Sequence, residues 1–127
     1  MKLSSWMAAK AIVVVIFGIG FVLVPVGLGS VFGLSLNPGG ALMAQLFGAA
    51  FILESIILWL SRNEPLSQAA VRAVVTAVVI SNAIGFVVTL LASLSGVWNA
   101  LGWLPVLLYL VFGLAFAYFL FSKPPAR

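Results

Sequence analysis

The sequence predicts an all-α fold, a single domain of residues 1–127 with four membrane-spanning helices in an up-down bundle. First, 65% of the 127 residues are hydrophobic and 6% are charged, whereas a soluble domain is about half apolar and about a quarter charged. Second, four apolar runs each approach the roughly 20 residues that cross a hydrocarbon core. Third, Lys and Arg occur only before the first run, between the second and third, and after the fourth, at Lys2, Lys10, Arg62, Arg72, Lys123 and Arg127.

Short loops rich in Lys and Arg stay on the cytoplasmic side. We therefore expect a multi-pass protein of the cell (inner) membrane with both termini in the cytoplasm. Lys2 and Lys10 before an apolar run resemble a signal peptide, but no clear Ala-x-Ala cleavage site follows, so we expect the first span to be retained. The predicted spans cover residues 11–32, 41–60, 69–93 and 100–121.

Local residues set the limits of these spans. Pro25 lies inside the first span and removes a backbone donor, which predicts a kink. Asn37 followed by Pro38 is typical of a helix start, and Asn99 is a plausible cap for the fourth span. Because the loops are short, consecutive spans should pack as antiparallel neighbours.

Composition also excludes several classes of function. The chain has no Cys and no His, so it forms no disulfide and lacks the commonest transition-metal and haem ligands. The net charge of +4 comes from cations dispersed at span ends, which fits an anionic membrane surface better than nucleic acid. The sequence contains no phosphate-binding loop and no nucleophile–His pair. We expect no enzymatic activity, no cofactor and no metal.

The chain also contains a predicted internal repeat. An offset of 65 residues aligns span one with span three and span two with span four, with 15 identities in 62 pairs. The matches include Ile19–Val22 with 84–87, and Phe47-Gly48 with Phe112-Gly113. Such halves would be parallel repeats. Gly48 and Gly113, shared by both, are predicted helix-packing positions.

Glu54 is the only acid inside a span, and intramembrane acids are costly and usually face protein or water. Two interpretations stay open. Glu54 pairs with Arg72, in the first turn of span three, or is a neutral hydrogen-bonded acid that fixes packing. Alternatively, Glu54 takes up a proton or binds a cation.

Gln45 and Asn82 lie at similar depth on antiparallel spans, so an amide–amide contact between them is geometrically possible. Asn82 begins a stripe that continues through Gly85, Thr89 and Ser93. This stripe predicts a tight helix interface, with a ligand pocket that Tyr109 could reach as the alternative. Gln45 and Glu54 are nine residues apart, on opposite faces of span two, which predicts protein on two sides of that span.

The short-looped spans and the run Phe47-Gly48-Ala49-Ala50-Phe51-Ile52-Leu53 that leads to Arg62 resemble small bacterial membrane proteins of the DoxX-like kind. The resemblance covers the whole chain and implies a four-helix membrane fold, but it transfers no active residue.

The set Gly48-Ala49-Ala50, Glu54, Leu60 and Arg62 is similar to the first helix of small multidrug resistance exporters. That resemblance implies a dimer in which Glu54 exchanges protons for cationic drugs. The sequence departs from that pattern, because the motif is in span two and the matching Tyr and Trp positions are missing.

Three functions follow, in order of preference. The first is a non-enzymatic accessory or structural subunit that packs against other membrane helices, as a homo-oligomer or with other subunits among membrane lipids. The second is a lipid- or quinone-binding bundle that uses Asn82 and Tyr109. The third is proton-coupled transport through Glu54.

Overall fold

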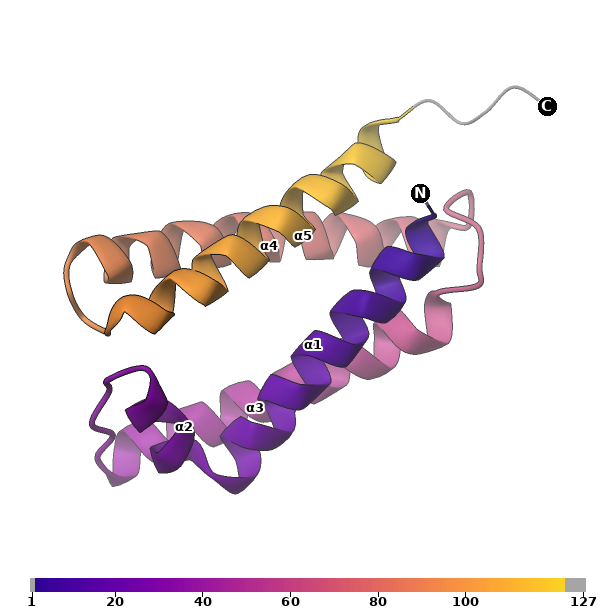
Figure 1. Cartoon of the computed structure of the whole chain (residues 1–127). Coiled ribbons are helices and arrows are strands. Elements are labelled where there is room, and N and C mark those ends of the chain that lie inside the picture. The colour runs from indigo at the N-terminus through magenta and orange to yellow at the C-terminus, as the bar shows by residue number, and fades with distance from the viewer. Residues whose placement is uncertain (1, 123–127) are drawn as a thin grey trace.

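The computed structural model describes residues 2–122, which contain helices and loops and no strand (Figure 1). Four stretches are long and apolar enough to cross a membrane, so the predicted fold class is confirmed. Lys123 and Arg127 lie outside the described residues. The helices are α1 (Leu3–Leu23), α2 (Pro25–Val31), α3 (Pro38–Ser61), α4 (Ala69–Leu94), the 3-10 helix η1 (Ala100–Gly102) and α5 (Trp103–Phe121).

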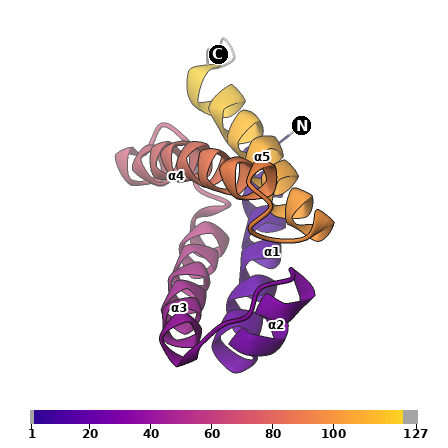
Figure 2. The ribbon, with the colours of Figure 1, turned by 90° about the vertical axis from the view of Figure 1, so that its left-hand side faces the viewer.

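The helices form two hairpins that differ from a uniformly packed bundle. The first hairpin consists of α1, α2 and α3, and the second of α4, η1 and α5. Helix α1 packs chiefly against α3 and α4 chiefly against α5, whereas contacts between the hairpins are few. Figures 1 and 2 show the two hairpins as separate layers joined by the 62–68 loop.

The first span differs from its prediction at both ends. Helix α1 begins at Leu3, eight residues before the predicted start, so Lys10 lies inside the helix. Pro25 does more than kink the span, because Val24 leaves the helical conformation (φ −135°, ψ 58°) and Pro25 starts a separate helix. Proline lacks the N–H that a continuous helix would need at this position. Asn37 caps α3 as predicted and accepts a hydrogen bond from Gly40 N at 2.6 Å.

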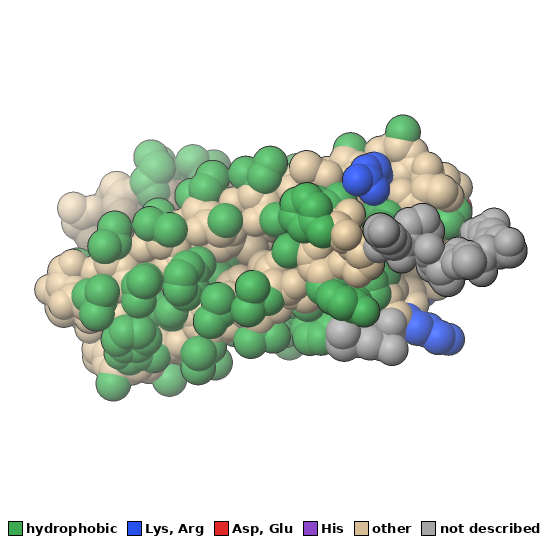
Figure 3. Space-filling view, turned by 90° about the horizontal axis from the view of Figure 1, so that it is seen from above, with side chains coloured by type: hydrophobic (Ala, Val, Ile, Leu, Met, Phe, Trp, Pro, Cys, Tyr) green, Lys and Arg blue, Asp and Glu red, His purple; other side chains and the backbone are tan. Residues whose placement is uncertain are grey.

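At one end of the molecule the hairpins share a hydrophobic core. We call this the basic end, because Lys2, Arg62 and Arg72 belong to it, and Figure 3 shows the visible cations gathered at one end of an otherwise largely apolar face. The core joins Met7 and Leu58 of the first hairpin to Val75 and Phe116 of the second, all fully buried.

At the opposite, uncharged end a smaller set of contacts joins the hairpins. Asn99 donates from Nδ2 to Val31 O at 2.9 Å and from its backbone N to Phe32 O at 2.9 Å. The Phe32 and Trp98 rings lie 5.7 Å apart. Gly33 adopts a positive φ of 77° beside Asn99, a conformation that favours glycine. We call these contacts the uncharged-end latch. The hairpins are therefore joined at both ends.

Candidate functional site

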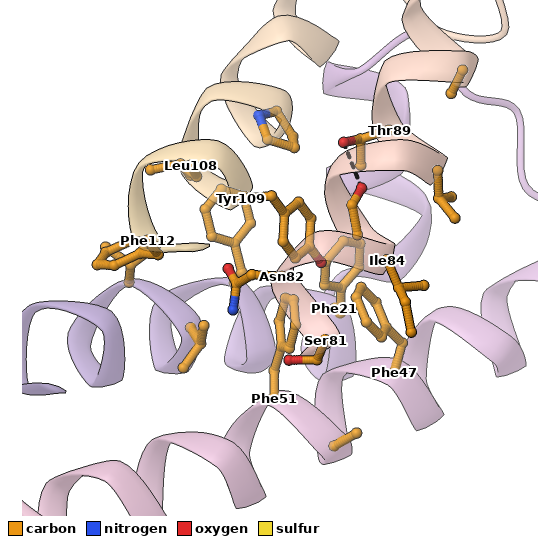
Figure 4. Close-up of a pocket in the computed structure, with 18 of the residues that line it drawn as sticks. Phe21, Phe47, Phe51, Ser81, Asn82, Ile84, Thr89, Leu108, Tyr109 and Phe112 are labelled. Atoms are coloured by element: carbon orange, nitrogen blue, oxygen red, sulfur yellow. Dashed lines mark hydrogen bonds between the residues drawn. The ribbon is translucent and has the colours of Figure 1, made fainter. Parts of the chain in front are cut away.

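Between the two joined ends lies a cavity of about 650 Å³, lined by residues of all four long helices. This volume is within the roughly 300–1,000 Å³ of small-molecule sites. The walls are mainly apolar and aromatic (Figure 4), and their phenylalanines are Phe17, Phe21, Phe32, Phe47, Phe51 and Phe112. Lys10, Glu54, Asn82 and Tyr109 also line the cavity, so a few polar groups face a largely hydrocarbon space.

Lys10 and Glu54 form an ion pair within the membrane-spanning part of the first hairpin. Lys10 Nζ lies 3.1 Å from Glu54 Oε1, and Lys10 is 3% exposed. The contact lacks the angles of a hydrogen bond, and Oε1 is buried without another donor, so the attraction is chiefly electrostatic. Each residue is seven positions from the basic end of its helix, or about 10 Å at 1.5 Å per residue.

The neighbouring residues hold this pair in place. Ser55, the residue after Glu54, donates to Ala11 O, the residue after Lys10, at 2.9 Å. Farther along, α1 and α3 cross at two glycines. A Cβ on Gly48 would lie 2.6 Å from Gly18 O, and a Cβ on Gly18 would lie 2.9 Å from Gly48 O. The small residues allow the backbones to approach closely, which lets Lys10 reach Glu54.

Gln45 stabilises the break between α1 and α2. Its Nε2 donates to Val22 O at 3.1 Å, a carbonyl beside the interrupted helix. Gln45 and Glu54 therefore both contact α1, although nine residues separate them. These two residues therefore give no reason to expect that α3, the second span, contacts protein on two sides.

Asn82 is a polar residue in the wall of the second hairpin, 1% exposed. Its Nδ2 donates to Val78 O at 2.7 Å. Since a carbonyl only accepts, this bond fixes the amide orientation and leaves Oδ1 as the free atom. Oδ1 is buried and has no partner among the described residues. Asn82 and Tyr109 also line a second cavity of about 260 Å³, so they form part of the wall between the two spaces.

Tyr109 of α5 packs its ring directly on Gly85 of α4. A Cβ on Gly85 would lie 2.4 Å from Tyr109 Cε1, so only glycine allows the ring this position. Figure 4 shows Tyr109 among the cavity residues of both hairpins. Among residues 2–122, no hydrogen bond is made by the Tyr109 hydroxyl.

The structure places several predicted residues differently from expectation. Glu54 pairs with Lys10 and not with Arg72, which is exposed. Gln45 and Asn82 do not contact each other through their amides, because each bonds to a backbone carbonyl. A Cβ on Gly113 would lie 3.3 Å from Asn82 Cβ, a looser contact than the one at Gly48. The stripe Asn82, Gly85 and Thr89 lies on the cavity wall.

Sequence reasoning missed Lys10, because a charged residue before an apolar run was interpreted as a flanking cation. A signal was present. Leu3, Trp6 and Met7 recur at helical spacing before Lys10, and neither Gly nor Pro separates them from Ala11. That pattern is typical of a helix that already buries one face.

No protein-family model matches this chain, and the searches of curated proteins and of solved structures found no significant match.

Proposed function

We propose that this integral membrane protein binds a neutral, lipid-soluble molecule in the cavity between its hairpins. The observation that supports this most is the cavity, with aromatic walls and a few polar groups that converge on it. This combination is typical of ligand sites, in which apolar area contributes affinity and a few polar groups fix orientation.

The ion pair favours a neutral ligand over a charged one. Glu54 already has a cation 3.1 Å away, so the two groups together carry no net charge. A cationic ligand would have to displace Lys10 and leave that ammonium unpaired at membrane depth, which is costly. The exporter-like use of Glu54 for cationic drugs is therefore less favoured than in the sequence-based hypothesis.

Native mass spectrometry of gently extracted protein tests this proposal. We expect one small apolar molecule per chain. Ala50 lines the cavity and Ala49 does not, although both are exposed residues of α3. Ala50→Trp should abolish the bound mass and the matched control Ala49→Trp should keep it. Equal occupancy in the two variants, or no bound molecule in the wild type, would contradict the proposal.

For location, we propose the inner membrane with the basic end, and hence both termini, in the cytoplasm. The cations Lys2, Arg62 and Arg72 at this end support the orientation. Reporter fusions at the two termini should both report the cytoplasm, and a fusion in the 33–37 loop should report the opposite side.

The role as an accessory subunit, the homo-oligomer, the tandem repeat and the DoxX-like relationship stay predictions. The division into two hairpins is the arrangement that a duplication of residues 1–62 onto 66–127 would produce. The argument for a partner from opposite faces of α3 no longer applies, because Gln45 and Glu54 both reach α1.

A further inference from the structure

We infer that the ligand carries a hydroxyl group, as in a long-chain alcohol or phenol, and that this hydroxyl donates a hydrogen bond to Glu54. The inference rests on the proposed function and specifies the head group that the cavity selects. It also assigns an orientation, with the hydroxyl at the basic end of the cavity and the apolar body toward the uncharged-end latch.

The first step is the state of the Glu54 carboxylate. Lys10 covers Oε1, which is buried. Oε2 is not among the buried atoms, and within residues 2–122 no donor is bonded to it. The Glu54 side chain is 24% exposed, and Glu54 lines the cavity. An ionised carboxylate only accepts hydrogen bonds, so a group that binds Oε2 must supply an O–H or N–H.

The second step is the choice among donors. A charged amine would compete with Lys10, whereas a hydroxyl donates without adding a charge. Lys10 itself is 3% exposed and held against Oε1, so it offers little to a ligand that only accepts. Tyr109, whose hydroxyl is also without a partner in the described chain, can accept or donate. Because the free Glu54 oxygen only accepts and Tyr109 can do either, a hydroxyl matches both groups, whereas an ether, ester or ketone oxygen could bond only to Tyr109.

The third step is the orientation. Glu54 and Lys10 belong to the end of the cavity toward the basic-end core, whereas Phe32, Val97 and Trp98 line the end beneath the latch. Between them the wall is formed largely by phenylalanines. A molecule with one hydroxyl and an apolar body therefore has one favourable direction, and an aromatic head would also gain ring contacts.

Two probes of nearly equal shape test the inference, 4-dodecylphenol and its methyl ether, 4-dodecylanisole. Each is titrated into the purified full chain in detergent, and binding is measured by native mass spectrometry. Since hydrogen bonds to charged groups are among the stronger ones, we expect the phenol to bind about tenfold more tightly or better. Equal affinities would overturn the hydroxyl assignment and leave the proposed function standing. Binding of neither probe would count against both.

Two variants test whether Glu54 is the group that causes the preference for the phenol over its methyl ether. Glu54→Gln supplies an N–H donor as well as an acceptor, so the preference for the phenol should fall several-fold, whereas Glu64→Gln in the 62–68 loop should keep it. If Glu54→Gln does not fold, the double variant Lys10→Met/Glu54→Gln removes both charges and serves the same comparison. An unchanged preference in the folded variant would overturn the role of Glu54.

Discussion

The two hairpins have the same outline but are held together by different interactions. In the first, polar contacts join the helices at three levels, through Lys10–Glu54, Ser55 to the Ala11 carbonyl and Gln45 to the Val22 carbonyl. In the second, no hydrogen bond joins α4 to α5 within the described part of the chain. Close packing takes that place, with the Tyr109 ring of α5 on Gly85 of α4, and Trp98 packs on Gly102 within the connection between the two helices.

This difference matters because lipid changes what each kind of contact contributes. Lipid tails are as apolar as Leu, so burial of apolar surface drives helix association only weakly, and close packing and polar contacts carry more of it. At the positions that the 65-residue offset aligns with Lys10 and Glu54, the second hairpin has Val75 and Phe119. The first hairpin therefore carries the charges of the cavity and most of its phenylalanines, and the second supplies Asn82 and Tyr109.

The largest expected effect comes from breaking the ion pair. Lys10→Met leaves Glu54 charged and unpaired, so we expect a loss of about 3–5 kcal/mol in the free energy of unfolding. Reversible unfolding in mixed micelles measures it. The double variant Lys10→Met/Glu54→Leu should recover most of the loss, because no unpaired charge remains. Exposed Lys2→Met is the control, and a Lys10→Met effect no larger than that of Lys2→Met would contradict the comparison.

The next effect tests the glycines that the repeat aligns. Gly48→Ala forces a Cβ toward Gly18 O, a backbone atom that cannot turn aside, and we expect a loss of about 1–3 kcal/mol. Gly113→Ala meets only Asn82 Cβ at 3.3 Å and should cost clearly less. Equal costs in the same unfolding assay would mean that the two crossings are equally tight.

A smaller effect is expected at the uncharged-end latch. Asn99→Ala removes the bond to Val31 O and the cap on Leu101 N, which together contribute about 1–2 kcal/mol. Asn63→Ala in the opposite loop is the control. Hydrogen exchange should increase at the uncharged end alone, and equal exchange at both ends would show that the latch does not hold the hairpins.

The smallest change is expected at Asn82. Its buried Oδ1 has no partner, so Asn82→Leu, which keeps the branch at Cγ, should leave stability unchanged or raise it by about 1 kcal/mol. Thr89→Val also replaces a polar side chain with an apolar one, and it removes only hydrogen bonds to carbonyls of the same helix. It therefore serves as the comparison for Asn82→Leu. A marked loss of stability in Asn82→Leu would show that Oδ1 makes a favourable contact.

Hydropathy and loop charge were enough to predict the four spans, because length and apolar composition dominate membrane insertion. The site was harder to predict. Glu54, Asn82 and Tyr109 are visible in the sequence as polar residues at membrane depth, but their partners depend on helix rotation and crossing, which the sequence does not set residue by residue. Lys10 was misplaced because a cation before an apolar run usually flanks a span, and no side-chain cap marks the start of α1 at Leu3.

Photolabelling tests the central claim, that a ligand binds between the hairpins, most directly. A diazirine-bearing dodecylphenol is activated on the intact protein, and the adducts are located by peptide mapping. The account predicts adducts on cavity residues of both hairpins, such as Phe51 and Tyr109, that excess 4-dodecylphenol suppresses. Adducts confined to outward-facing residues such as Leu60 and Leu107, or adducts that excess phenol leaves unchanged, would contradict it.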